Sequence, residues 1–341
     1  MLFKLVWPRF WHRKNLTSYL LLPLSWVYLI GSKIIKVYRQ RIAATNCQLK
    51  APIIIVGNII VGGTGKTPLA ICLANLLKKH HYSPGIITRG YGRKKNQQTL
   101  LVTYQSTPEE VGDEVLLIAK HTSCPIIVSR NRVEAASKLI QQHHCNVIIS
   151  DDGLQHYKLP RYLEIVLSET NAITNNNFCL PAGPYREPLK RLDTVDLIVK
   201  NFNTDLVSFQ ASKNYSLALE VTNIRKVNDP KQIKLLKYFN GLKLHAIAGI
   251  GNPKKFFDTL KTLGLDVIEH HFPDHHWYQA SDFKNLKGPI IMTEKDAIKC
   301  IKLANDNFWY LETLPIISTN LETALLSKLK TFTHNQPSKL K

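Results

Sequence analysis

The first 108 residues contain no aspartate or glutamate, although they hold 16 lysine and arginine residues. The net charge of +20 is therefore concentrated in this segment, which carries +16, whereas the rest of the chain carries only +4. Such asymmetry excludes an evenly charged surface. It indicates an anionic partner for the N-terminal part: a membrane surface, a nucleic acid or an anionic substrate.

Paired cysteines are also absent. The six cysteines are widely scattered and include no Cys-x-x-Cys pair, which excludes a zinc ribbon or a disulfide framework and fits a reducing cytosol. No internal repeat is visible. The 341 residues are 44% hydrophobic and 21% charged, values typical of a folded protein of about two domains.

A glycine-rich segment is the strongest motif in the chain. An apolar strand at 53–56 leads into Val61-Gly62-Gly63-Thr64-Gly65-Lys66-Thr67, and an apolar helix is predicted from Pro68 to Lys79. Glycines let backbone N–H groups surround a phosphate chain, and the helix N-terminus adds its positive dipole end. Lys66 would reach the outer phosphates and Thr67 would ligate Mg²⁺. The segment therefore predicts a nucleotide-phosphate site.

The exact form of this loop narrows the class of protein. The common pattern requires glycine at position 60, where this chain has Ile60, so the seven-residue variant x-Gly-Gly-x-Gly-Lys-Thr fits better. In nucleotide switches that use this variant the leading residue is a lysine, and here it is Val61. This departure argues against the switch class.

An uncharged run of 18 residues, from Asn15 to Ser32, precedes the loop, with basic residues on both sides. As a helix it would be about 27 Å long, just short of the hydrocarbon thickness, and Pro23 is expected to kink it. We expect a helix or helical hairpin that dips into one leaflet of an anionic membrane. A single span and a buried core helix are the alternatives. A cleaved signal peptide is not expected, because a nucleotide site follows directly.

The rest of the chain alternates between short apolar strands and helices, which predicts a doubly wound, mostly parallel α/β sheet of the P-loop NTPase type. We expect a membrane-associating segment at 1–40, a nucleotide-binding kinase domain at 41–215 and a smaller α/β domain at 216–341. Residues 171–191 contain three prolines and are predicted to form a long loop over the strand ends. Predicted strands lie at 84–88, 99–103, 125–129, 146–150, 163–167, 195–200, 215–221, 243–249, 265–271, 289–293 and 308–311, and further helices at 113–121, 131–143, 253–263 and 321–329.

Two carboxylates, Asp151 and Asp152, follow the buried strand at 146–150, with His156 shortly after them. In phosphate-loop proteins the carboxylate that holds Mg²⁺ or its water comes from this position. The alternative for Asp152 is a purely structural role in an Asp-Gly pair that forms a turn. His156 would orient a carboxylate or be a polar loop residue.

Other candidates are spread along the chain. Asp113 starts a predicted helix, so an N-terminal cap is the alternative to a functional role. His275 lies in Phe-Pro-Asp-His-His, far away in the second unit. A His–Asp pair would make a general base for an alcohol, but the sequence does not show that the two segments meet. Candidates for phosphate or substrate contact are Arg89, Tyr91, Arg130, Arg132 and Arg186 with its neighbour Glu187. Thr293-Glu-Lys-Asp296 is either functional or a helix cap.

In order, these motifs resemble the tetraacyldisaccharide 4′-kinase family, the lipid A 4′-kinases. The collinear set covers residues 16 to 300 and comprises VGNIIVGGTGKTP, TRGYGR, VGDE, SDDGLQH, LPAGPYREP, FPDHH and MTEKDA. The resemblance implies ATP-dependent phosphorylation of the 4′-hydroxyl of a tetraacylated glucosamine disaccharide 1-phosphate, giving lipid IVA. The reaction would take place on the cytosolic face of a Gram-negative inner membrane, and we expect a monomer that binds no nucleic acid.

The resemblance also implies roles for individual residues. ATP would be held by Arg186 and by the loop residues Gly62, Gly63, Thr64, Gly65, Lys66 and Thr67. Lys66 and Asp152 would serve catalysis directly. Thr67, Asp151, Asp152 and Glu187 would hold Mg²⁺, Asp113 with His275 would activate the hydroxyl, and Tyr91, Arg89 and His156 would face the substrate. A regulatory or nucleic-acid-stimulated phosphate-loop ATPase at the membrane is the alternative, although no RNA-binding motif is present.

Overall fold

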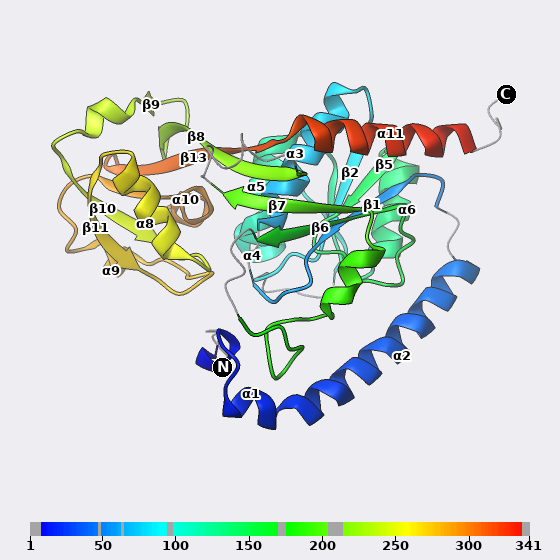
Figure 1. The fold of residues 1–341 in the computed structure, drawn as a ribbon. Helices are drawn as coiled ribbons and strands as arrows, with labels where there is room; N and C mark the ends of the chain where they lie inside the picture. The colour runs from blue at the N-terminus through cyan, green and yellow to red at the C-terminus, as the bar shows by residue number, and fades with distance from the viewer. Residues whose placement is uncertain are drawn as a thin grey trace.

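The computed structural model describes residues 8–46, 49–62, 65–93, 98–169, 175–203 and 214–335. These residues form one mostly parallel sheet with helices on both faces, and a long helix runs along the outside of the molecule (Figure 1). The strand order is β11-β10-β12-β13-β8-β7-β6-β1-β5-β2-β4-β3, with β9 paired to β8. The predicted doubly wound α/β fold is confirmed.

The first unit contains the nucleotide motif. Its strands are β1 (Ile53–Gly57), β2 (Pro84–Thr88), β3 (Leu100–Leu101), β4 (Ile126–Val128), β5 (Val147–Ser150), β6 (Leu163–Glu169) and β7 (Leu197–Asn203). Its helices are α3 (Lys66–Lys79), α4 (Pro108–Val111), α5 (Asp113–Thr122), α6 (Arg132–Gln142) and the short η2 (Leu189–Thr194). The predicted strand at 84–88 is confirmed to the residue, while the one predicted at 99–103 shrinks to β3.

Strand β1 is buried on both faces of the sheet. Ile54 and Val56 pack into the core that α3 covers, whereas Ile53 and Ile55 pack into the core that α6 covers. A strand covered on both sides needs apolar residues at every position, which explains why its sequence is an unbroken apolar run. Helix α3 turns leucines toward the sheet at every fourth position, namely Leu69, Leu73 and Leu77.

The second unit continues the same sheet. Its strands are β8 (Ser216–Lys226), β9 (Ile233–Lys234), β10 (Lys243–Ala248), β11 (Asp266–His271), β12 (Ile290–Thr293) and β13 (Phe308–Ile317). Its helices are η3 (Leu236–Phe239), α8 (Pro253–Thr262), α9 (Ala280–Phe283), α10 (Glu294–Cys300) and α11 (Thr319–Asn335). The boundary expected at residue 216 therefore falls inside a continuous sheet. The antiparallel β8–β13 pair extends through both units.

Helix α11, expected in the second unit, lies along the first unit instead (Figure 1). Leu321, Leu325 and Leu329 are fully buried in the core that α3 covers. The chain thus returns to the first unit through β13. The sequence pattern revealed the helix but not the unit on which it packs.

Helices α5 and α10 join the two units by a buried ion cluster. Glu294, only 6% exposed, accepts from Lys120 Nζ at 2.6 Å and lies 3.0 Å from His121 Nε2. Lys120 Nζ also donates to the Tyr310 hydroxyl at 2.8 Å. Because these helices begin at Asp113 and Glu294, the cluster sets the spacing between polar residues of the two units.

The N-terminal part forms the short η1 (Arg9–Trp11), then α1 (Leu16–Leu20) and the long α2 (Leu22–Asn46). The helical run is interrupted at Leu21, between α1 and α2. Pro23 lies in the first turn of α2, where its missing N–H costs no hydrogen bond. The kink expected at Pro23 is therefore a helix start. None of the helices in the described ranges combines the length and apolar character needed to cross a membrane, so the single span is not found. Nor is α2 a buried core helix, since Val27 and Ile34 are 68% and 64% exposed.

A loop of residues 175–188, called here the Pro-rich loop, lies between α1–α2 and the phosphate loop. On one side Trp11 Nε1 donates to the Pro181 carbonyl at 2.9 Å. On the other side Val61 N donates to the Pro184 carbonyl at 2.9 Å. The part predicted as a loop at 189–191 belongs to η2, and residues 171–174 lie outside the described ranges.

Candidate active site

The carboxyl ends of strands from the two units face each other across the β8–β13 pair. Strand β7 runs parallel to β8 and pairs with its first residues, 216–218, whereas β12 runs parallel to β13 and pairs with its first residues, 308–311. Because β8 and β13 are antiparallel, β7 points toward the second unit and β12 toward the first. Polar motifs that follow strands in both units therefore converge.

The phosphate loop connects β1 to α3, as predicted. Gly65 has φ 84°, and a Cβ there would lie 2.6 Å from Asn201 Nδ2, so the tight turn requires glycine. Lys66 and Thr67 are the first two residues of α3. Gly62 is described, while Gly63 and Thr64 lie outside the described ranges.

The ammonium group of Lys66 lies between the loop and the strand β5. Lys66 Nζ donates to Asn58 Oδ1 and to the Gly62 carbonyl, both at 3.3 Å, and it lies 3.4 Å from Asp152 Oδ1. Arg186 Nη1 lies 3.5 Å from the same carboxylate oxygen. Burial on its own would raise the pKa of Asp152, but the charges of Lys66 and Arg186 lower it. The site therefore holds two cations on one carboxylate.

Asp151 is compensated less fully, because the charges of Lys66 and Arg132 do not outweigh its burial. It is 4% exposed; Oδ2 accepts from Thr88 Oγ1 at 3.3 Å, and none of the described residues forms a hydrogen bond with Oδ1. Burial, with the nearby charges of Asp152 and Glu114, raises the pKa of Asp151 to about 7. A buried carboxylate oxygen without a partner fits a bound cation.

No three acidic, histidine or cysteine side chains form a complete metal cage within the described residues. This suits Mg²⁺, which takes one or two protein carboxylates and completes its shell with phosphate oxygens and water. Thr67 Oγ1 donates to Glu114 Oε2 at 3.1 Å, so its lone pairs remain for the nucleotide side. Thr67, Asp151 and Asp152 thus fit the predicted metal.

Glu187, predicted beside them, has other partners. Gln155 Nε2 donates to Glu187 Oε1 at 3.0 Å, the Tyr157 hydroxyl donates to Oε2, and Arg191 Nε lies 3.3 Å from Oε2. Both oxygens are engaged inside the protein. In this state Glu187 supports Gln155, Tyr157 and Arg191, and its role as a ligand of the metal stays a prediction.

The structure brings Asp113 and His275 together, although 162 residues separate them. His275 Nδ1 lies 3.0 Å from Asp113 Oδ2, and Asp113 is 5% exposed. Burial on its own would raise the pKa of Asp113, but the hydrogen bond from His275 and the charge of Lys295 lower it to about 2. The preceding Gly112 has φ 98° and packs so closely on the Tyr91 carbonyl that a Cβ would lie 2.6 Å from it.

Lys295 is a site residue for which the sequence analysis assigned no role. Its Nζ lies 3.0 Å from Glu114 Oε1, 3.4 Å from His275 Nε2 and 3.9 Å from Asp113 Oδ2. An ammonium group only donates, so His275 Nε2 accepts and the Nδ1–H donates to Asp113. The contacts therefore assign the tautomer of His275. The motif MTEKDA contained the only signal, and its helix-cap reading is also confirmed, because Thr293 caps α10.

Glu114, also not predicted, links the two halves of the site. One carboxylate oxygen accepts from Thr67 of the phosphate loop and the other from Lys295 beside the histidine. Its position directly after Asp113 on α5 was the available signal. The phosphate loop and the His–Asp pair thus share one hydrogen-bonded group.

The three predicted substrate residues do not form one cluster. The exposed Tyr91 ring lies 5.0 Å from that of His275, between ring centroids. His156 instead lies near Arg132 and Arg39, and burial together with their charges lowers its pKa to about 4. Arg89 is exposed after β2.

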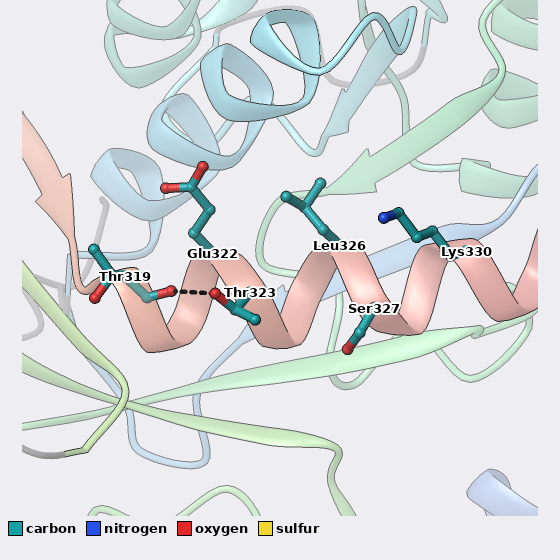
Figure 2. Close-up of a pocket in the computed structure, with 6 residues that line it drawn as sticks. All are labelled: Thr319, Glu322, Thr323, Leu326, Ser327 and Lys330. Atoms are coloured by element: carbon teal, nitrogen blue, oxygen red, sulfur yellow. Dashed lines mark hydrogen bonds between the residues drawn. The ribbon is translucent and has the colours of Figure 1, made fainter.

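Of two hollows in the surface of the described residues, one lies at the candidate site and the other does not. A small one is lined by Gly92, Pro108, Asp113, His275, Trp277 and Lys299, and so lies directly at the His–Asp pair. A larger, shallow one lies along a single face of α11 and contains none of the motif residues; Figure 2 shows its lining residues Thr319, Glu322, Thr323, Leu326, Ser327 and Lys330. Of the two, the small hollow is the one lined by the predicted catalytic residues.

The chain is similar in sequence to a family of known proteins. The family model described as tetraacyldisaccharide-1-P 4′-kinase matches residues 17–330. The tetraacyldisaccharide 4′-kinase of Nitrosococcus oceani is 41% identical over 94% of this chain and 94% of its own, and that of Methylobacillus flagellatus is 44% identical over 94% and 93%.

A solved structure is similar over almost the whole chain. It is the "apo" form of LpxK from Aquifex aeolicus in complex with ATP, which is 28% identical and has a TM-score of 0.74. The match covers 92% of this chain and 99% of that one.

The contact between Asp113 and His275 predicts how the free energy of unfolding depends on pH. A carboxylate whose pKa is lower in the folded state stabilises the fold above its unfolded pKa of 3.8, and this contribution is lost as the pH falls through about 2. We expect Asp113→Asn to lower the free energy of unfolding by about 2 kcal/mol at pH 6. Urea unfolding between pH 6 and pH 3 should show the gap between variant and parent closing below pH 4. The exposed Asp193→Asn serves as control, and a gap that stays constant down to pH 3 would contradict the prediction.

Proposed function

The chain belongs to the tetraacyldisaccharide-1-P 4′-kinase family, and on that premise we propose an ATP-dependent transfer of phosphate to the 4′-hydroxyl of a tetraacylated glucosamine disaccharide 1-phosphate, giving lipid IVA. The observation that carries the proposal is the His275–Asp113 pair beside the phosphate loop. A regulatory ATPase needs a positioned water but no separate base for an alcohol on a second unit.

On the acceptor side, His275 is the proposed base. Asp113 accepts the Nδ1–H, which holds the ring in one orientation and stabilises the imidazolium that forms. Nε2 then takes the proton of the 4′-hydroxyl as the oxygen attacks the γ-phosphorus and ADP leaves. The ammonium of Lys295, 3.4 Å from Nε2 in the free protein, must give up that contact when the hydroxyl arrives.

On the donor side, Lys66 and Arg186 are the proposed cations for the phosphates, and Gly62 and Gly65 allow the backbone to approach them. Both cations contact Asp152 in the free protein, so ATP binding would draw them from the carboxylate to the phosphates. Magnesium, held by Thr67, Asp151 and Asp152, would neutralise charge that develops on the transferred group.

The surface of α1–α2 supports a membrane location. Its outward face exposes Leu16, Leu24, Val27, Ile30 and Ile34, each more than half exposed. Apolar side chains in this number on one helix face, flanked by lysine and arginine, suit the plane of an anionic membrane. We propose that the enzyme binds the cytoplasmic face of the inner membrane, where ATP and an acylated acceptor meet. A membrane that covers this face leaves no need for a second copy, so the proposed state is a monomer.

The first test measures transfer directly. With [γ-³²P]ATP and Mg²⁺, label should move to the tetraacylated disaccharide 1-phosphate, and Lys66→Met should reduce the rate at least about a hundredfold, because it removes charge from the transferred phosphate. Parallel reactions contain duplex DNA, RNA or no acceptor. ATP turnover stimulated only by nucleic acid, without labelled lipid, would overturn the kinase proposal.

A second prediction concerns the His–Asp pair. Asp113→Asn and His275→Asn should each lower kcat by about 10² to 10⁴, and the double variant should be no worse than the poorer single one, because the residues act as one unit. Steady-state transfer assays at saturating ATP give the three ratios. Multiplicative losses would argue for separate roles.

A third prediction concerns the outward face of α2. Ile34→Glu should weaken binding to anionic lipid vesicles about tenfold or more, because it places a charge among the apolar side chains. Gln40→Glu adds the same charge at an exposed position on another side of the helix and should change binding by a small factor only. Vesicle co-sedimentation compares the two, and equal losses would refute an apolar contact.

A further inference from the structure

The inward face of α1–α2 combines an apolar contact of Leu29 with polar side chains that hold the Pro-rich loop. Ser25 lies within the uncharged run expected in lipid, yet it is only 2% exposed. Its hydroxyl donates to the Cys179 carbonyl at 2.9 Å and accepts from Ala182 N at 3.1 Å. One side chain thus satisfies two buried backbone groups on opposite sides of a turn in the loop.

One helical turn further along, Tyr28 reaches the end of the loop that carries Arg186. The Tyr28 hydroxyl donates to the Arg186 carbonyl at 2.9 Å. Earlier in the chain, Asn176 Nδ2, fully buried, donates to the Phe10 carbonyl at 3.1 Å and to Ser18 Oγ at 3.2 Å. The loop is therefore attached to α1–α2 along its described length.

The other side of the same loop pairs with the phosphate loop. Arg186 N donates to the Ile59 carbonyl at 2.7 Å, and Ile60 forms an antiparallel bridge with Tyr185. Val61, the leading residue of the glycine-rich motif, donates to the Pro184 carbonyl. Arg186 thus connects Tyr28 directly to the start of the phosphate loop. Its carbonyl accepts from the Tyr28 hydroxyl, and its N–H donates to the Ile59 carbonyl.

We propose that Ser25 and Tyr28 are positioning residues for the nucleotide site and act through the Pro-rich loop. The loop sets the path of residues 59–61 and the direction of the Arg186 side chain, which contacts Asp152. Helix α2 therefore has two separable faces: the outward one for the membrane and the inward one for ATP. This inference rests on the proposed function, because it assigns ATP to the phosphate loop.

Deletion of residues 1–35 would change membrane binding and the nucleotide site at the same time. Such a deletion removes Ser25 and Tyr28 together with the apolar face, and with them the Ser25 hydroxyl that bonds to the Cys179 carbonyl and to the Ala182 N–H. Single substitutions on one face separate the two roles.

The test measures ATP binding with the full-length protein in detergent micelles. Calorimetric titration with ATP and Mg²⁺, without acceptor, gives the Kd from the curvature and the folded fraction from the stoichiometry. Tyr28→Phe and Ser25→Ala should each raise the Kd about three- to tenfold, the range expected for one hydrogen bond, with vesicle binding unchanged. Ser25→Thr keeps the hydroxyl and should restore the Kd.

Matched controls lie on the same helix. Tyr38→Phe makes the same chemical change at a tyrosine that is 64% exposed, and Ser32→Ala removes a hydroxyl that donates to Leu29 within the helix. Both should leave the Kd unchanged. If Ser25→Ala proves too unstable to titrate, Tyr28→Phe decides alone.

Parental Kd values in Tyr28→Phe and Ser25→Ala would overturn the inference and leave the proposed function intact, as would a lower stoichiometry at an unchanged Kd, which signals a structural role only. A parent protein that binds no ATP would overturn the proposed function and this inference with it.

Discussion

An antiparallel pair of strands determines where the chemistry of this protein lies. Strand β8 leaves the first unit and β13 returns to it, and each is joined by parallel strands only near its own start. The strands on either side of the pair therefore run toward each other, and their carboxyl ends meet. An ordinary doubly wound sheet has all its carboxyl ends at one edge and a ligand in the crevice outside them. Here two such edges face one another, one with a phosphate loop and the other with a histidine.

Charge holds these facing edges together. The Lys295 ammonium lies among the carboxylates of Glu114, Asp274 and Asp113, and the pKa of Lys295 is raised because these charges outweigh its burial. Removal of one partner from such a buried group is costly, because it leaves charge without compensation. The residue before Lys295, Glu294, forms ion pairs with Lys120 and His121 of α5. Two ion clusters from adjacent residues of one short helix thus align His275 with the phosphate loop.

The sequence predicted those parts of the fold whose cause is local. Strand 84–88, the turn at Gly65 and the cap at Thr293 follow from apolar runs, glycine geometry and side-chain capping. Asp113 and His275 were recognisable as candidates, but their contact depends on the path of the β8–β13 pair, which leaves no local pattern. Lys295 and Glu114 look like ordinary surface charges in the sequence. Ser25 was misleading for a different reason: an uncharged serine is equally compatible with lipid and with a buried backbone.

Polar and apolar residues are distributed on α2 in an unusual way. In a helix of a globular protein the apolar face is inside, whereas α2 buries Ser25 and half-buries Tyr28 and exposes Val27 and Ile34. Hydrogen bonds to backbone groups of the Pro-rich loop compensate the buried polar groups, and Leu29 adds an apolar contact with the core of the first unit. Val27 and Ile34 take no part in this contact and remain exposed. The same polarity that attaches α2 to the nucleotide site therefore makes its outer face suitable for lipid, and the acceptor's acyl chains and the ATP would be served by opposite sides of one helix.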